Sequence, residues 1–501
     1  MKNLKILTSL ITVSIVASTI SGCGSKKAIS TNVDTSKEKY TITCLENVGG
    51  ITMPQGANDF VKTGIDKALN IDLQLQLPGG NDYTVALNTR IASGDMPDLF
   101  SVPSRQYLSQ YVSNGVLLDL TKYKDKFSQT LKFIGDASVK KGEINNKLYA
   151  ISKAPASNSN SLLLRKDWLD KLGLKMPTTP DELLAVAKAF TENDPDGNKK
   201  NDTYGFSGSG LGGFTSIFAP YGVTPMENFL VKDNKLTCTL YESGYKDAIA
   251  EINKFVTQGA LDPDFLINTG DNVTDKAVQG KVGIINSTWA NMLKDDQVAK
   301  EKAVNPNATW VQVDALTGPG GKYVETVDIS NSPMLYAIPK SLEKNPVKLQ
   351  RVIDLINYVS SEKGNRLVDF GVEGRHYNVT DGKVVSTPLM GKECGYTWAY
   401  QFTGRDEIPY LSTKFVNQAK AIEYANKLPR ITILTGFFDI PTEVNKADVE
   451  KYIESEVSKF IYGKRSISEF DSFTKTLNNT YGLKNYFDSA VAQAKTMGYT
   501  K

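Results

Sequence analysis

The chain has 501 residues, of which 40% are hydrophobic and 9% are aromatic, so it can bury a sizeable core. That length is too great for one compact core and predicts two domains. The formal net charge of +3 argues against a nucleic-acid binder, which would need a concentrated excess of Lys and Arg.

Cysteine and histidine usage argues against several kinds of site. None of the four cysteines forms a CxxC pair, so a zinc site or a thioredoxin-like motif has no support. Because His376 is the single histidine, His-rich metal sites are excluded, and a catalytic Ser–His–Asp or Cys–His arrangement has little support. We interpret Cys44, Cys238 and Cys394 as three small buried hydrophobic residues, with one disulfide as the alternative.

The N-terminus is typical of an export signal. Lys2 and Lys5 precede an apolar run over 6–20, which is too short for a bilayer-spanning helix and ends in small residues. Ser21 and Gly22 then precede Cys23, and this order resembles the bacterial lipobox. The resemblance implies a signal peptide over 1–22 and lipidation of Cys23; the alternative is an ordinary signal peptide with a chance cysteine. Residues 23–38 are polar and predict a flexible tether.

The first folded segment alternates strands and helices. Hydrophobic spacing predicts a strand over 40–44, a helix near 56–69 and a strand over 71–77. A helix capped by Asn81 and closed by Gly94 follows, and then a strand over 98–102. This succession predicts a parallel sheet flanked by helices, with ligands beyond the carboxyl ends of its strands.

A second α/β unit begins near residue 162. Its first strand is Leu-rich, and residues 179–182 (Thr, Pro, Asp, Glu) carry the capping residues of a helix start. Further helices are predicted over 243–257 and 347–363, and the last hundred residues are predicted to be mostly helical.

An acidic loop over 194–202 predicts a Ca²⁺ site. Oxygen-bearing side chains stand at loop positions one, three, five and nine, and a backbone carbonyl is available at seven; these residues are Asp194, Asp196, Asn198, Asp202 and Lys200. The loop lacks the glutamate of a full EF-hand, which indicates a structural site of modest affinity. The alternative is an Asp/Asn/Gly turn without metal.

Aromatic residues give candidate ligand contacts. Trp289 follows a strand-like segment and begins a predicted helix, where it can line a crevice at the end of a sheet. Tyr396, Trp398 and Tyr400 alternate, so in an extended segment they would share one face. Flat rings cover the apolar faces of sugars, although burial in a core is an equally good interpretation of both features.

Polar candidates are fewer. Arg105, in the loop predicted after the strand over 98–102, and Arg375 could bind carboxylates or paired hydroxyls through their forked donors, or could be solvated or salt-bridged. Residues 208–213 match GxGxxG, but no acidic residue follows at the distance a dinucleotide site needs, so a tight turn is the better interpretation. We find no GxSxG or HExxH motif.

Together, several segments resemble the extracellular solute-binding lipoproteins for carbohydrates, a family that includes maltodextrin- and alginate-binding proteins. The matching segments run in the family's order over nearly the whole mature chain; they are the lipobox and residues 92–99, 164–173, 194–202, 259–265, 281–289 and 371–377. The alginate-binding branch has an acidic residue directly after the loop's last Asp, whereas this chain has Thr203.

The resemblance implies an α/β, two-lobed fold of the periplasmic-binding-protein type, with hinge closure around a ligand. We predict one lobe from 39–157 plus 333–400 and the other from 158–332 plus 401–501. The resemblance also implies that Trp289 and Trp398 stack on sugar rings, that the acidic loop binds Ca²⁺, and that Arg105, Tyr396 and Arg375 are candidate contacts.

The function expected from this resemblance is ligand capture for an ABC-type importer. The ligand would be an oligosaccharide, neutral or acidic, and the partners would be the transmembrane permease subunits and, through the lipid, the outer face of the bacterial membrane. We expect a monomer that binds no nucleic acid and catalyses no reaction. Two alternatives remain: a lipid-anchored lyase or glycosidase, and the same fold with a peptide, polyamine or other solute.

Overall fold

The computed structural model describes residues 38–48, 51–78, 82–332 and 334–501. The predicted signal peptide, Cys23 and nearly all of the predicted tether lie outside the described residues. Of the helices within the described ranges, none combines the length and the apolar character that crossing a bilayer requires.

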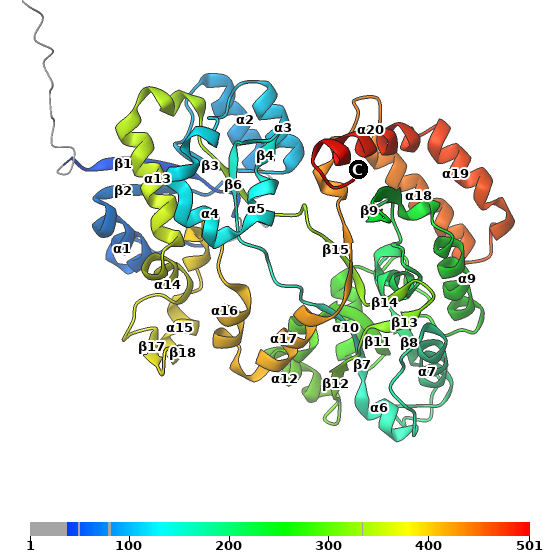
Figure 1. The fold of residues 1–501 in the computed structure, drawn as a ribbon. Helices are drawn as coiled ribbons and strands as arrows, with labels where there is room; N and C mark the ends of the chain where they lie inside the picture. Colours follow the sequence, from blue (N-terminus) through cyan, green and yellow to red (C-terminus); the bar gives the residue numbers. More distant parts are fainter. Residues whose placement is uncertain (1–37, 49–50, 79–81, 333) are drawn as a thin grey trace, which may run out of the picture. The chain divides into compact units, whose positions relative to one another are not determined.

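The first sheet has five strands in the order β2-β1-β3-β16-β6 (Figure 1). Its members are β1 (Tyr40–Leu45), β2 (Ile71–Gln76), β3 (Leu99–Val102), β6 (Ala150–Ser152) and β16 (Leu335–Ala337). β1 runs parallel to β2 and β3, which confirms the parallel succession predicted from sequence. β16 arrives from far along the chain and pairs antiparallel with both β3 and β6, so the sheet is mixed.

Helices flank this sheet. They are α1 (Phe60–Leu69), α2 (Tyr83–Ser93), α3 (Arg105–Ser113), α4 (Ser128–Ile134), α5 (Asp136–Lys141), α13 (Pro346–Ser360) and α14 (Glu362–Phe370). The first helix starts later than predicted because the Asp59 carboxylate caps it, accepting from the Lys62 amide at 2.9 Å. The predicted cap Asn81 lies outside the described residues. The single helix predicted over 347–363 is two helices, because Ser361 ends one and caps the next.

The second sheet has the order β12-β7-β11-β8, and its strands are β7 (Asn160–Arg165), β8 (Tyr204–Ser207), β11 (Val282–Thr288) and β12 (Trp310–Gln312). Its helices are α6 (Lys166–Lys171), α7 (Pro180–Glu192), α8 (Thr215–Phe218), α9 (Gly244–Thr257), α10 (Gly270–Val278), α11 (Trp289–Leu293) and α12 (Asp295–Val304). The predicted start of α7 is confirmed: the Thr179 side chain accepts from the Glu182 amide, and Pro180 occupies the first turn.

The other strands of the described residues form separate two-stranded sheets: β4 (Glu143–Ile144) with β5 (Lys147–Leu148), β9 (Phe229–Lys232) with β10 (Lys235–Cys238), β13 (Leu316–Gly318) with β14 (Gly321–Tyr323), β15 (Glu325–Asp328) with β19 (Arg430–Ile433), and β17 (Tyr377–Thr380) with β18 (Lys383–Ser386). The C-terminal helices are α15 (Pro388–Glu393), α16 (Glu407–Lys414), α17 (Ala419–Lys427), α18 (Lys446–Ile461), α19 (Phe470–Asn479) and α20 (Leu483–Thr496). The predicted helical C-terminal region is thus confirmed.

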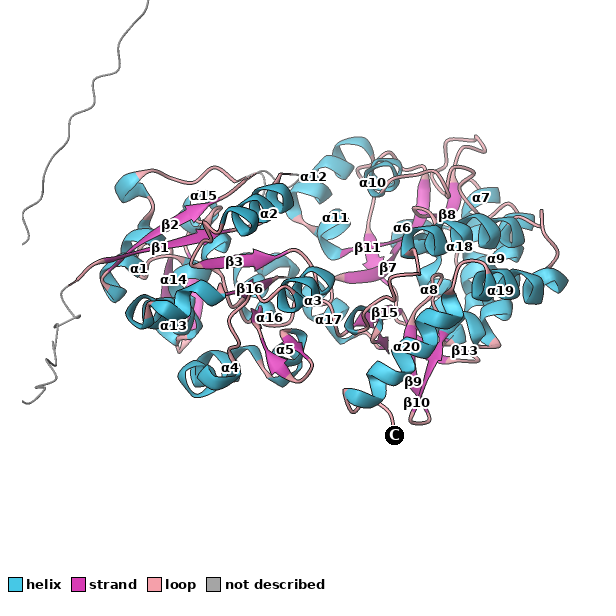
Figure 2. Ribbon diagram, turned by 90° about the horizontal axis from the view of Figure 1, so that it is seen from above, coloured by secondary structure: helices cyan, strands magenta, loops and turns pink. Residues whose placement is uncertain are grey.

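Two large hydrophobic cores accompany the two sheets, and each is built from two stretches of the chain. One draws on residues 42–151 and 336–402, and the other on residues 162–316 and 434–494. The chain therefore leaves each core and returns to it, as the predicted two-lobed α/β architecture requires; Figure 2 shows the strands of the two sheets as separate groups. Cys44, Cys238 and Cys394 are buried and unpaired, which confirms their interpretation as small core residues.

Candidate ligand-binding site

A cavity of about 650 Å³ opens at the carboxyl ends of β1 and β3, where ligands of α/β sheets usually bind. We call it the Arg105 cavity. Its wall combines the β3–α3 connection, the segment after β15 and the loop after β19, and includes Asn47, Ser104, Arg105, Ser332 and Asp439. Polar groups from segments far apart in sequence therefore converge on a space within the usual range of ligand pockets, about 300–1,000 Å³.

Arg105 is the first residue of α3, not a loop residue as predicted. Its Nε donates to the Phe437 carbonyl and its Nη1 to the Lys141 carbonyl, both at 3.1 Å. Burial lowers the pKa of the guanidinium, and the Asp439 carboxylate opposes that effect. Two donors of Arg105 are thus committed to the backbone, so the side chain ties α3 to the loop after β19 as well as lining the cavity.

A second cavity, of about 450 Å³, has Trp398 in its wall, and we call it the Trp398 cavity. Both aromatic and polar side chains line it; they are Trp398, Tyr410, Phe415, Lys153, Gln401, Arg405, Glu407 and Lys414. The Arg405 guanidinium lies 3.8 Å from the centre of the Tyr410 ring and is held by Glu407, with Nη2 to Oε2 at 3.2 Å. An aromatic face beside oriented polar groups suits a sugar, which presents apolar C–H faces and a rim of hydroxyls.

The two cavities adjoin at the pair of segments that follow β6 and precede β16. The Lys153 amide, in the Trp398 cavity, donates to the carbonyl of Met334, which lines the Arg105 cavity, at 3.0 Å. The structure therefore brings Arg105 and Trp398 into neighbouring cavities rather than into one.

The predicted aromatic face of Tyr396, Trp398 and Tyr400 is wrong. Residues Thr397–Tyr400 form a 3-10 helix, not an extended segment. Tyr396 and Tyr400 are buried with their rings edge-on, 6.3 Å between centroids, whereas Trp398 is partly exposed in the cavity wall. The reason is backbone conformation: residues two apart share a face only in an extended segment, whereas in a 3-10 turn of three residues they point to different sides.

Trp289 directly follows β11 and begins α11, at the strand-to-helix junction that the sequence predicts. Its indole is only 4% exposed and packs against Ile422 and Ala425 of α17 and edge-on against Phe415, with ring centroids 5.3 Å apart. Trp289 lines neither of the two cavities, although Phe415 lines the Trp398 cavity. Its packing is that of a core residue, and its stacking on a sugar stays a prediction.

Arg375 lies in an ionic cluster outside both cavities. Its Nε and Nη2 donate to the Glu393 carboxylate at 2.9 and 3.1 Å, and the buried His376 contacts the same carboxylate through Nε2 at 2.9 Å. Hydrogen bonds from Arg375 and His376 lower the pKa of Glu393 to about 2. Arg375 thus joins α15 to the segment before β17, which corresponds to the salt-bridged alternative rather than to a ligand contact.

The acidic loop brings its predicted oxygen ligands together. The Asn198 amide nitrogen donates to Asp196 at 2.8 Å and to Asp202 at 3.0 Å. Burial raises the pKa of the Asp196 carboxyl, and the nearby carboxyls of Asp194 and Asp202 raise it further. Like charges therefore crowd in this loop, although the Lys281 ammonium offsets part of the charge at Asp202, at 2.9 Å.

Carboxylates alone do not complete a metal site in this loop. Across the described part of the chain, no group of three or more His, Cys, Asp or Glu side chains has an arrangement that could hold a metal ion. A cation here would also need the side-chain oxygen of Asn198 and the carbonyl of Lys200, which are neutral ligands that suit a hard cation such as Ca²⁺.

Comparison with known families decides the class of protein. The model of the bacterial extracellular solute-binding protein family matches residues 51–366, more than half of the chain. The chain belongs to this family. The match confirms the resemblance inferred from sequence, and members of such a family act outside the cytoplasm.

Relatives in this family include proteins named for saccharide ligands. Lipoprotein LipO of Bacillus subtilis (strain 168) is 27% identical over 389 residues, 76% of each chain. The polygalacturonan/rhamnogalacturonan-binding protein YtcQ of the same organism is 27% identical over 325 residues, 64% of each chain. The fructooligosaccharide ABC transporter substrate-binding protein FusA of Streptococcus pneumoniae serotype 4 is 24% identical over 464 residues, 81% of each chain.

Solved structures share the fold. A solute-binding protein from Bifidobacterium longum infantis, described as HMO-binding and associated with an ABC transporter, superposes with a TM-score of 0.71 at 18% identity, over 92% of this chain and all of that one. FusA in complex with kestose superposes with a TM-score of 0.67 at 20% identity, over 92% of this chain and 99% of that one. These similarities support the two-lobed solute-binding fold described above.

Sequence reasoning missed several residues that line these two cavities, above all Asn47, Lys153 and Arg405. Asn47 could have been found, because it follows the first predicted strand at its carboxyl end, where ligands of parallel sheets bind. Lys153 had a weaker signal, since it follows a strand of only three residues that was not predicted. Arg405 had none, because its place beside Tyr410 depends on the tertiary fold.

Proposed function

We propose that this protein is the substrate-binding lipoprotein of an ABC-type importer and that it captures an oligosaccharide. Membership of the solute-binding family supports the capture role, and the names of YtcQ and FusA support a saccharide ligand. The observation that carries the proposal is the Trp398 cavity. There a partly exposed indole stands beside Gln401 and the oriented Arg405–Glu407 pair, so one wall can cover a sugar face while the other binds its hydroxyls.

The adjoining Arg105 cavity gives room for further sugar units. Its hydroxyl and amide groups, among them Ser104, Asn228, Ser330 and Asn331, can donate to and accept from hydroxyls in either direction. Its wall draws on β3 of the first sheet and on Phe438 and Tyr486, which belong to the core of the second sheet. A hinge motion in the segments between β6 and β7 and between β15 and β16 would therefore enclose a bound sugar.

A thermal-shift panel of neutral oligosaccharides, uronate oligomers, peptides and amines tests this function. A ligand that binds only the folded state stabilises it by about 2.7 kcal/mol at one hundred times its Kd, so a cognate sugar should raise the melting temperature clearly. The sugar should be recovered unaltered after incubation with the protein. A response confined to peptides or amines would reject the saccharide ligand, and new reducing ends or unsaturated sugars would show a lyase or glycosidase instead.

The same proposal includes a lipid anchor and a permease partner. We expect Cys23, following Ser21 and Gly22, to be acylated, so that the monomer is held at the outer face of the membrane and docks on the permease subunits. Cells fed labelled palmitate should yield a labelled, membrane-associated protein, and Cys23→Ser should abolish the label and release the protein. Labelling that survives the substitution would contradict lipidation at Cys23.

Ca²⁺ is proposed as a structural ion of the acidic loop. The supporting observation is the crowding of like charge at Asp196, which a divalent cation bound by Asp194, Asp196, Asn198 and Asp202 would relieve. Adding Ca²⁺ should raise the melting temperature of chelator-treated protein, and Asp196→Asn should remove that increase. Identical melting curves with Ca²⁺ and with chelator would show that the loop is a metal-free turn.

A further inference from the structure

The Lys153 ammonium stands in the wall of the Trp398 cavity without a hydrogen-bond partner among the described residues. Its backbone is fixed by the bond to the Met334 carbonyl, and its ammonium lies 5.7 Å from the centre of the Tyr336 ring. Burial lowers the pKa of this ammonium, which means that its charge is poorly hydrated. A partly buried cation of this kind gains more from an anionic partner than a fully exposed one does.

The protein's own carboxylates near Lys153 do not supply that partner. Glu46, at the end of β1, is fully buried and already accepts from the Tyr336 hydroxyl at 2.7 Å and from the Cys44 thiol at 3.2 Å. The other charged groups that act on Lys153 are Arg405, which disfavours its charge, and Glu407 and Asp369, which favour it. Glu407 is paired with Arg405, and Asp369 accepts from Gln401 at 2.9 Å.

The rest of the cavity wall adds to the excess of positive charge. Three cations, Lys153, Arg405 and Lys414, line it together with one carboxylate, Glu407, which the Arg405 guanidinium neutralises. Lys414 donates to the Tyr410 hydroxyl at 3.1 Å, a neutral partner. Among the described residues, neither Lys153 nor Lys414 therefore forms an ion pair in this wall.

We propose that the Trp398 cavity takes a carboxylated sugar unit, a uronate, whose carboxylate pairs with the Lys153 ammonium while its ring lies on Trp398. This inference rests on the proposed saccharide ligand and narrows it to acidic oligosaccharides. Lys153 is then the residue that sets the preference for an acidic over a neutral sugar. A single carboxylate suits this wall, because the forked donor that would favour a sulfate or phosphate ester, Arg405, is occupied by Glu407.

Calorimetry with a matched pair of ligands tests the inference on the wild-type protein. The probes are trigalacturonate and galactotriose, with triglucuronate and cellotriose as a second pair. We expect at least one uronate trimer to bind about tenfold or more tightly than its neutral counterpart. Equal affinity within both pairs would overturn the acidic preference and leave the proposed saccharide capture standing; binding of no saccharide would overturn both.

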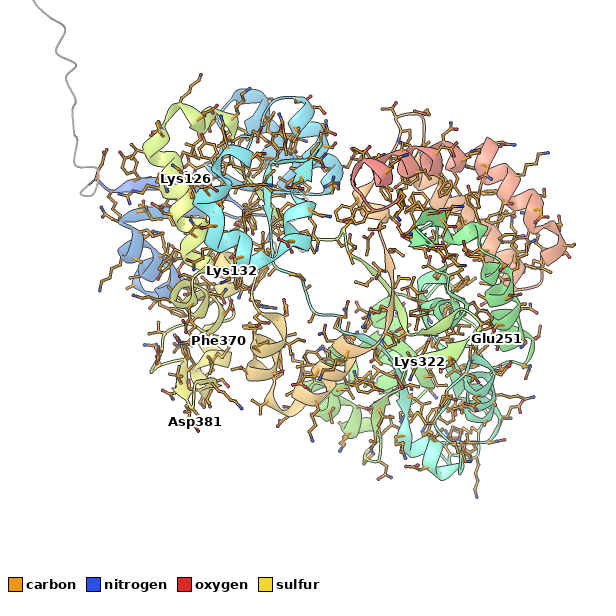
Figure 3. The ribbon with its side chains drawn as sticks, viewed as in Figure 1. Lys126, Lys132, Glu251, Lys322, Phe370 and Asp381 are labelled. Carbon is orange, nitrogen blue, oxygen red and sulfur yellow. The ribbon has the colours of Figure 1, made fainter. Side chains whose placement is uncertain are left out.

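Three variants assign the preference to Lys153. Lys153→Met keeps the length and apolar stem, and should lose about tenfold in affinity for the uronate while changing neutral-sugar binding less than about twofold. Lys153→Arg keeps the charge and should retain the acidic preference. Lys132→Met removes an exposed ammonium on α4, outside the cavity wall (labelled in Figure 3), and should change neither affinity. An unchanged uronate preference in Lys153→Met would refute the role of Lys153.

Discussion

Replacing Trp289 by alanine should lower the free energy of unfolding by about 3–5 kcal/mol, because removing a large buried side chain loses its transfer free energy and leaves a cavity. Trp289 is 4% exposed and fills the space between α11 and α17, where it contacts Phe415, Ile422 and Ala425. Urea unfolding followed by circular dichroism measures the change. Trp289→Phe, which keeps an aromatic ring, should lose much less.

Substitution of Trp398 should affect ligand binding more than stability, in contrast to substitution of Trp289. It is partly exposed in the cavity wall, so Trp398→Ala should destabilise the protein less than Trp289→Ala does. The same substitution should weaken oligosaccharide binding about tenfold or more, since a stacked indole contributes a few kcal/mol. If Trp289→Ala instead left stability unchanged and weakened binding, the stacking role that its strand-to-helix position suggests would be right and the core assignment wrong.

The parts of the fold that sequence predicted are those with local causes. The strand Tyr40–Leu45 and the helix Pro180–Glu192 follow from alternation and from the capping residues Thr179 and Glu182, all within one element. The parts it missed have partners far away. β16 is three residues long and enters the first sheet between β3 and β6, and β15 pairs with β19 about a hundred residues later. Such pairings leave no periodic signal in either segment.

For the candidate site as well, sequence predicted some features and missed others. Residue type was enough to single out Trp398 and Arg105, and both line cavities. Geometry was not predictable, because alternating aromatics at 396, 398 and 400 fit an extended segment as well as a helical turn. Lys153 was missed for a different reason: its importance lies in its place beside the buried Glu46, which is a property of the assembled sheet and not of either strand.

Glu46→Gln should remove a pH-dependent loss of stability that this buried carboxyl causes. Burial raises the pKa of Glu46 to about 7 from an ordinary value of 4.5, against the opposing charge of Lys153 and the hydrogen bonds from Tyr336 and Cys44. The folded state therefore binds this proton more tightly than the unfolded state does. The stabilisation is complete below about pH 4.5 and is lost as the pH rises through about 7, a change of about 3 kcal/mol.

Glutamine has the shape of the protonated acid and can still accept from the Tyr336 hydroxyl, so variant and wild type should have similar stability at about pH 4.5. At about pH 8.5 the variant should be more stable by about 3 kcal/mol, because only the wild type must then hold a buried carboxylate. Urea unfolding across this range measures the difference. Glu443→Gln removes a carboxyl at an exposed position and is the matched control. A difference between Glu46→Gln and wild type that stays constant with pH would mean that Glu46 does not change its charge in this range.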